Sequence, residues 1–150
     1  KDLTRHRFAS FSIESTRYCS YNKDKYGNEI TFINPVYIEN EEMYNTWKDS
    51  MQNIEKNYIK MKELGASTDM VRELLPHSTA AEYTMTANIR EWKHILELRT
   101  TSHVHPAIRQ VLIPLLLYFK EEMPEIFDDV QYDTGFNKDY YAKLSIEDEV

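Results

Sequence analysis

The stretch that most constrains the fold reads Asn88-Ile-Arg-Glu-Trp-Lys-His-Ile-Leu-Glu-Leu-Arg-Thr-Thr101. It predicts a helix with one face that is apolar except at its two ends. That face carries Asn88, Trp92, Ile95, Leu96 and Arg99. An arginine on an apolar face is unfavourable unless an anion or a polarised oxygen pairs with it. Two interpretations of Arg99 therefore stay open: an ion pair with Glu14 or Glu82, or a contact with a bound ligand.

Upstream of this helix the sequence predicts two more helices. Asn40 is placed to cap a long helix that begins at Glu41, and Gly65 suits the left-handed conformation that ends it. The apolar positions of the long helix are Trp47, Met51, Ile54, Tyr58 and Met61. A short helix capped by Thr68 is then expected from Asp69 to Leu75, where the following proline stops it.

The expected sheet is small. Gly27-Asn28 separates Tyr18–Tyr26 from Ile30–Ile33, a pattern that is typical of a β-hairpin. Residues 79–87 are rich in Thr, Tyr and small side chains and predict a further strand. The chain is therefore expected to be an α+β, helix-rich domain with a small antiparallel sheet.

Downstream, Pro106 suits the first turn of another helix, which continues past Pro114. Its expected apolar stripe comprises Ile108, Val111, Leu112, Leu115 and Phe119. The segment after Pro124 is acidic and aromatic and is expected to pack only partly. We interpret residues 1–150 as one domain in which residues 128–150 form an acidic tail.

Composition excludes several classes of function. The net charge of −7 argues against a nucleic-acid binder, which needs a basic face. The single cysteine, Cys19, excludes an internal disulfide and favours a reducing cytoplasm. No apolar run is long enough to span a bilayer, so no membrane partner is expected. His103 and His105 have no carboxylate or thiol at ligand spacing, so no metal site is expected.

Arginines are the candidate phosphate ligands, because the three glycines form neither a GxGxxG motif nor a P-loop. Arg5, Arg7 and Arg17 lie within thirteen residues and repel one another unless an anion lies among them. Two interpretations stay open: a basic loop paired with the acidic tail, or an anion site. Ser15 has no activating base beside it in sequence, so a hydrogen bond to a ligand is expected there rather than nucleophilic attack. Cys19 is interpreted as a small, half-buried apolar residue.

The arginine cluster also carries a family resemblance. Arg5-His6-Arg7, Ser10, Ser15 and Arg17-Tyr18 resemble the signature Arg-His-Arg-x-x-Ser-x-Asn-x-x-Ser-x-Arg-Tyr of the flavin-dependent thymidylate synthases (the ThyX family). Ser12 stands where the family most often has Asn, and Ile13 stands where it has Glu or Gln. Two further segments resemble that family in the same order: Arg72-Glu-Leu-Leu-Pro76 and the helix from Asn88 to His103.

The resemblance implies a role for each matching position. Arg99 is the implied catalytic residue, in contact with the uracil ring. The implied FAD-binding residues are Arg5, His6, Arg7, Ile13, Asn88, Ile89, Arg90 and His94. The implied dUMP-binding residues are Arg5, Glu14, Ser15, Thr16, Arg17, Arg72 and Arg99, with Arg72 reaching the site from another subunit. His103 is implied to lie near the flavin or the folate.

The resemblance also implies the reaction, which is reductive methylation of dUMP to dTMP. Methylenetetrahydrofolate is the implied carbon donor, and NADPH-reduced FAD is the implied hydride donor. The implied assembly is a homotetramer with active sites shared between subunits. Because Lys1 opens the chain without a start signal, we expect an N-terminal portion of the family to be missing. Two other functions stay open: a non-catalytic flavin- or nucleotide-binding module, and an acidic interaction domain with incidental arginine pairs.

Overall fold

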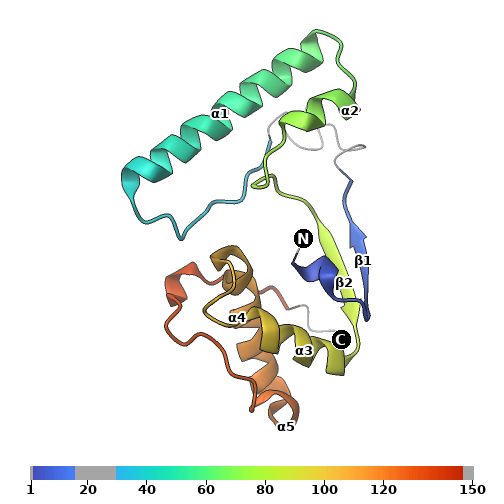
Figure 1. Cartoon of the computed structure of the whole chain (residues 1–150), viewed down its shortest axis with the longest axis vertical. Helices are drawn as coiled ribbons and strands as arrows, with labels where there is room; N and C mark the ends of the chain where they lie inside the picture. Colours follow the sequence, from blue (N-terminus) through green and yellow to red (C-terminus); the bar gives the residue numbers. More distant parts are fainter. Residues whose placement is uncertain (1, 16–29, 147–150) are drawn as a thin grey trace. The chain divides into compact units, whose positions relative to one another are not determined.

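The computed structural model describes residues 2–15 and 30–146, and the chain divides into two compact units (Figure 1). Unit 1 comprises Lys1–Ser10 and Met85–Val150, and unit 2 comprises Phe11–Thr84. Helices predominate, and one small two-stranded antiparallel sheet accompanies them. The predicted fold class, α+β and helix-rich, is confirmed.

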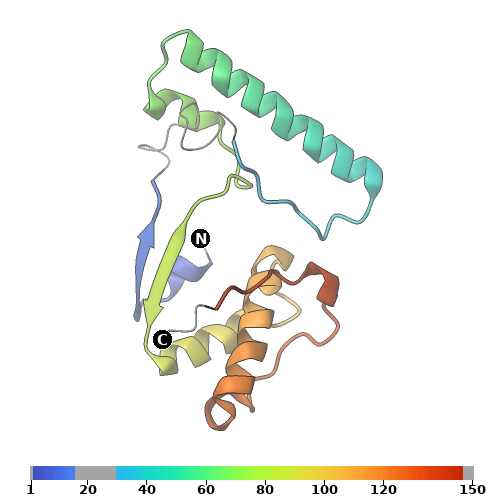
Figure 2. The ribbon, with the colours of Figure 1, turned by 180° about the vertical axis from the view of Figure 1, so that it is seen from behind.

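The sheet pairs β1 (Ala9–Ile13) with β2 (Tyr83–Ala87), and both views show the two strands side by side (Figures 1 and 2). β1 was not predicted, because residues 5–18 show no alternation of apolar and polar side chains. The strand predicted over residues 79–87 is shorter than expected. Its first part makes only an isolated antiparallel bridge between Thr79 and Phe32, and regular pairing begins at Tyr83. That bridge also replaces the strand predicted over residues 30–33, and the predicted turn at residues 27–28 lies outside the described residues.

Unit 2 is organised around α1 (Glu41–Glu63), whose two ends were predicted correctly. The Asn40 side chain accepts a hydrogen bond from Met43 N at 2.9 Å, which satisfies a free N–H of the first turn. Gly65 has a φ of 88°, and the N–H groups of Gly65 and Ala66 donate to the carbonyls of Lys62 and Met61. This Schellman motif ends the helix.

The short helix of unit 2 differs from its prediction in two ways. α2 (Thr68–Val71) has Ser67, not Thr68, at its N-cap, and the helix tightens into the 3₁₀ turn η3 (Arg72–Leu74) before Pro76. The tightening has a physical reason, because Leu75 precedes a proline and must leave the helical conformation. The core of unit 2 is formed by Ile30, Tyr58 and Val71, with Phe32, Met61, Leu74 and Leu75 packed against them.

Unit 1 is built from helices. They are the 3₁₀ turn η1 (Leu3–Arg5), α3 (Ile89–Arg99), α4 (Pro106–Glu122), α5 (Pro124–Phe127) and the 3₁₀ turn η4 (Lys138–Tyr140). The buried core comprises Ile95, Leu96, Leu112, Leu116, Phe127 and Val130. Each such side chain contributes about 1.5–3 kcal/mol by leaving water.

The apolar stripe predicted for α4 is partly wrong. Val111 is 43% exposed, whereas Ile113 and Leu116 are completely buried. α4 packs against both α3 and α5, so its buried surface is wider than one stripe and is rotated relative to the prediction. None of the helices among the described residues has the length and apolar character needed to cross a membrane.

The proline inside α4 leaves one backbone carbonyl of the helix available to bind the C-terminal segment of the chain. Pro114 has no N–H, so the carbonyl of Gln110 lacks its helical donor. The N–H of Ala142 takes that place and donates to the Gln110 carbonyl at 2.7 Å.

Side chains also hold the C-terminal segment against α4. Arg109 forms an ion pair with Asp133 and lies over the Phe136 ring, 4.5 Å from its centroid. The segment after Pro124 buries Phe127, Val130 and Phe136, whereas Leu144, Ile146 and most of its described acidic residues stay exposed.

Candidate functional site

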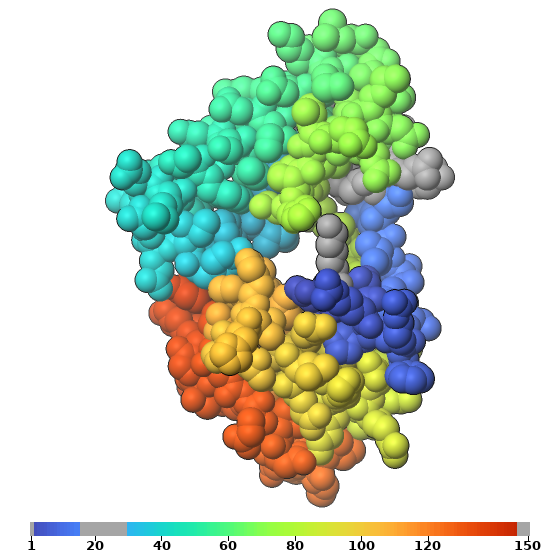
Figure 3. All heavy atoms as spheres, in the orientation of Figure 1, coloured from blue at the N-terminus to red at the C-terminus, as the bar shows by residue number. Residues whose placement is uncertain are grey.

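Unit 1 contains a cavity of about 690 Å³ between the residues that precede β1 and the exposed side of α3. In the space-filling view the N-terminal segment, dark blue, lies against α3, yellow (Figure 3). The residues that line the cavity are Arg5, His6, Arg7, Phe8, Arg90, Glu91, Lys93, His94, Glu97, Leu98 and Arg99.

The sheet brings these two segments together. In the antiparallel pair, the start of β1 lies beside the end of β2, and β2 leads directly into α3 through Asn88. The Asn88 side chain accepts a hydrogen bond from Glu91 N at 2.9 Å, which fixes where the helix begins. Leu3 packs against the core of unit 1 and holds the other end of the segment. Residues 5–8 are therefore held along the first turns of α3.

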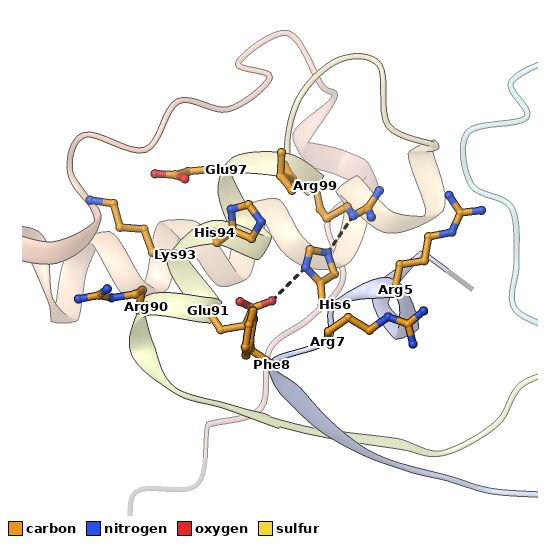
Figure 4. Close-up of a pocket in the computed structure, with 11 residues that line it drawn as sticks. Arg5, His6, Arg7, Phe8, Arg90, Glu91, Lys93, His94, Glu97 and Arg99 are labelled. Atoms are coloured by element: carbon orange, nitrogen blue, oxygen red, sulfur yellow. Dashed lines mark hydrogen bonds and ion pairs between the residues drawn. The ribbon is translucent and has the colours of Figure 1, made fainter.

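A chain of three side chains crosses the wall of the cavity (Figure 4). His6 Nδ1 lies 3.2 Å from Glu91 Oε1, and Arg99 Nε donates to His6 Nε2 at 3.1 Å. The Arg99 guanidinium also donates through Nη2 to the carbonyl of Asp2 at 3.2 Å. His6 and Glu91 are buried, and the His94 ring lies edge-on to His6 with 6.0 Å between centroids.

His6 is neutral in this arrangement. Burial lowers its pKa from the usual 6.5, and the nearby charge of Arg99 lowers it further, while Glu91 acts in the opposite direction. The geometry at the ring agrees, because Nε2 accepts a hydrogen bond from Arg99 and so carries no proton. Nδ1 therefore carries the proton and donates it to the Glu91 carboxylate.

The cavity is rich in cations that form no ion pair with the described residues. Arg5, Arg7 and Arg90 are exposed, and none forms an ion pair within residues 2–15 and 30–146. Figure 4 shows Arg99, Arg5 and Arg7 extending to one side of His6, and Arg90 and Lys93 to the other. Lys93 is paired with Asp129 at 2.7 Å. The alternative in which Arg5 and Arg7 pair with the acidic tail finds no support in the described part of the chain.

The ion pair proposed for Arg99 with Glu14 or Glu82 is not formed. Arg99 contacts His6 and the Asp2 carbonyl instead. Glu14 and Glu82 bond to each other in unit 2, where Glu14 N donates to the Glu82 carbonyl at 2.9 Å. The physical reason is that these glutamates continue the β1–β2 pairing.

The cavity brings together six of the residues expected in the site, and the others lie elsewhere. The six are Arg5, His6, Arg7, Arg90, His94 and Arg99. Asn88 caps α3, and Ile89 is exposed in the first turn of that helix. Ile13 is exposed at the end of β1, and Ser15 is exposed just after that strand. Arg72 belongs to η3 of unit 2. Thr16, Arg17 and Cys19 lie outside the described residues.

Sequence reasoning missed Glu91, which is the buried partner of His6. A signal was present, because Glu91 lies four residues before the apolar Ile95, on the side of the helix that faces the protein. A carboxylate at such a position needs a donor. The exposed Phe8 and the ion-paired Lys93 gave no comparable signal.

The described residues offer no group of three or more His, Cys, Asp or Glu side chains that could hold a metal ion. His105 uses its Nδ1 to accept from Ala107 N at 3.2 Å and so caps α4. His103 is exposed in the turn between α3 and α4.

Comparison with known families decides the classification. A sequence profile of the family described as Thymidylate synthase complementing protein matches residues 1–125. The chain belongs to this family. The signature that begins at Arg5 and the α3 segment that ends in Arg99 both lie inside the matched region.

Individual relatives of the thymidylate synthase complementing family agree. The flavin-dependent thymidylate synthase of Pyrococcus abyssi is 33% identical over 115 residues, which cover 76% of this chain and 46% of the relative. The enzyme of the same name from Corynebacterium efficiens is 27% identical over 145 residues, covering 89% of this chain and 57% of the relative. The chain therefore spans about half the length of the curated relatives it matches.

A solved structure shares the fold. The thymidylate synthase ThyX of Helicobacter pylori, solved with FAD and dUMP at 2.31 Å resolution, superposes with a TM-score of 0.64. The alignment covers 86% of this chain and 65% of that one, at 19% sequence identity.

Proposed function

We propose that this chain is part of a flavin-dependent thymidylate synthase that reductively methylates dUMP to dTMP. The observation that carries the proposal is the cavity of unit 1, which is lined by Arg5, Arg7, Arg90 and Arg99, all within the residues that the family profile matches. Within residues 2–15 and 30–146, Arg5, Arg7 and Arg90 form no ion pair. Methylenetetrahydrofolate as carbon donor, NADPH as reductant and a cytoplasmic location belong to the same proposal.

The residues present suit an anionic flavin nucleotide. The chain has a net charge of −7, yet the cavity concentrates Arg5, Arg7 and Arg90 beside only two carboxylates. One of those carboxylates, Glu91, already faces His6. The planar guanidinium fork matches phosphate oxygens in a way that lysine does not. We assign Arg5, Arg7, Arg90 and His94 to FAD, which supplies the hydride chemistry when it is bound.

Arg99 is proposed to act on the pyrimidine. A guanidinium held at the N3–O4 edge of uracil stabilises negative charge on that edge and makes C5 electron-rich. Arg99 is suited to this role because His6 and the Asp2 carbonyl fix its orientation without neutralising its charge. A carboxylate partner would cancel that charge.

The remaining dUMP contacts are assigned by family position. Glu14 and Ser15 follow β1 in unit 2, and Arg72 lies in η3. We propose that Thr16 and Arg17 complete the phosphate site, and that Arg72 contributes from another subunit of a homotetramer. Ile13, Asn88 and Ile89 are assigned to the flavin on the same grounds.

Release of tritium from [5-³H]dUMP by the purified protein tests the proposal. The proposal is supported if the protein shows flavin absorbance and releases tritium only when both NADPH and methylenetetrahydrofolate are present. A flavin-containing protein that releases no tritium would instead be a binding module. A colourless protein that binds neither FAD nor dUMP contradicts both.

A further inference from the structure

The cavity is lined by five Lys or Arg side chains and two carboxylates, and one of these carboxylates, Glu91, is buried. Its side chain is 9% exposed, and its backbone N–H is already held by Asn88 in the first turn of α3. Burying a carboxylate is unfavourable unless it receives hydrogen bonds. Its oxygen lies 3.2 Å from His6 Nδ1, on the side of the ring away from Arg99.

The direction of each hydrogen bond follows from Arg99. Its Nε is a donor only, so His6 Nε2 must accept, and the proton of the neutral ring is on Nδ1. That proton points at Glu91. Arg99, His6 and Glu91 therefore form one directed chain in which each group donates to the next.

We propose that Glu91 is a positioning residue, which sets the orientation of the Arg99 guanidinium by fixing the tautomer of His6. Without the Glu91 acceptor, the neutral ring is free to carry its proton on Nε2. Two donors would then face each other at a separation of about 3 Å, and Arg99 would turn away. The remaining contact with the Asp2 carbonyl, through Nη2 alone, allows the guanidinium to rotate.

The charged and titratable groups around His6 come from two segments. α3 supplies Glu91, His94 and Arg99, and the N-terminal segment supplies Arg5 and Arg7 on either side of His6 in sequence. Glu91 is the only carboxylate among these five, and its Oε1 lies within hydrogen-bond distance of His6 Nδ1. The catalytic consequence rests on the proposed function, because it requires that Arg99 acts on dUMP.

The first arm of the test is independent of activity. ¹⁵N NMR of the histidine ring nitrogens reports the tautomer of His6 in the wild type, Glu91→Ala and Glu91→Gln, with the exposed Glu121→Gln on α4 as control. We expect protonated Nδ1 in the wild type and the control, and an increased Nε2–H population in Glu91→Ala. An unchanged tautomer in Glu91→Ala overturns the proposal.

Glu91→Gln covers the case in which Glu91→Ala fails to fold, because it keeps the shape and an acceptor oxygen. It should retain the Nδ1–H tautomer and lower the pKa of His6 in an NMR titration, since the nearby carboxylate raises that pKa. An unchanged pKa would mean that Glu91 does not act on His6 in solution, which overturns the proposal.

The second arm measures catalysis. Glu91→Ala should lower kcat by about 10²-fold, the typical loss when a catalytic group is displaced by about 1 Å, while FAD still binds. Glu91→Gln should restore most of that loss. Because Glu91 acts through His6, Glu91→Ala should add little to the loss caused by His6→Ala. A normal kcat in Glu91→Ala with an altered tautomer contradicts the positioning role.

If the wild type neither binds FAD nor turns over dUMP, the proposed function fails, and the NMR arm still decides whether the chain of hydrogen bonds exists.

Discussion

Arg99 donates its Nε–H to Nε2 of His6 at 3.1 Å, so a cation is held by a neutral ring rather than by a carboxylate. The guanidinium keeps its full charge and presents its other nitrogens to the cavity and to the Asp2 carbonyl.

Replacing Arg99 separates catalysis from cofactor binding. Arg99→Ala should reduce turnover of dUMP by at least about 10²-fold, because the charge at the pyrimidine edge is lost. FAD should remain bound, as flavin absorbance of the purified variant would report. Arg99→Lys keeps a charge but has no Nε–H for His6, so it should also be impaired. Near-normal turnover in Arg99→Ala would remove this residue from the mechanism.

Acidification should release Arg99. Burial and Arg99 hold the pKa of His6 below 6.5, so the unfolded chain binds this proton more readily than the folded one. The stability contributed by neutral His6 is therefore complete above pH 6.5 and is lost as the pH falls through the lowered pKa. Urea unfolding at several pH values measures this, and His6→Gln should show a weaker pH dependence below 6.5. Equal pH dependence in the two proteins would show that His6 does not titrate with folding.

The attachment of the C-terminal segment to α4 depends on Pro114. Pro114→Ala restores an N–H that competes with Ala142 for the Gln110 carbonyl. Hydrogen exchange at Ala142 should become faster, while α4 gains up to about 3 kcal/mol of helix propensity. Slow exchange at Ala142 in the variant would mean that other contacts hold this segment.

The left-handed conformation of Gly65, at the end of α1, can be tested separately from side-chain packing. Gly65 has a φ of 88°, and a Cβ added there would meet nothing within 4 Å. Gly65→Ala should therefore destabilise the protein by about 1–2 kcal/mol through backbone strain alone. Gly65→Asn should lose less, because Asn tolerates the left-handed region better. Thermal unfolding of the three proteins gives the comparison, and equal stability would show that the Schellman turn is not maintained in solution.

The sequence predicted the elements whose signals are local. Asn40, Gly65 and Asn88 mark helix ends through their own side chains or conformations, and the structure has helix ends at all three. β1 was missed because its pairing with β2 joins residues seventy or more positions apart and leaves no local periodicity. Long-range pairing of this kind is settled by the fold rather than by nearby residues.

The candidate site was predictable only in part for a similar reason. The arginines of residues 5–7 and of α3 were visible as clusters, and the cavity joins them. Glu91 was not selected, because its importance comes from a contact with His6, eighty-five residues away. The partners of Arg99 were also mispredicted, since a neutral histidine and a backbone carbonyl leave no charge pattern in the sequence.

The proposed function requires that Arg5, Arg7 and Arg90, which form no ion pair with the described residues, bind the phosphates of a flavin nucleotide. Equilibrium titration of the flavin-free protein with FAD tests it most directly, comparing the wild type, Arg7→Ala and Lys60→Ala, an exposed cation on α1. We expect Arg7→Ala to weaken FAD binding about tenfold or more, in line with the loss of a charged hydrogen bond, while Lys60→Ala matches the wild type. Equal affinity in all three proteins would show that Arg7 does not bind the flavin phosphates.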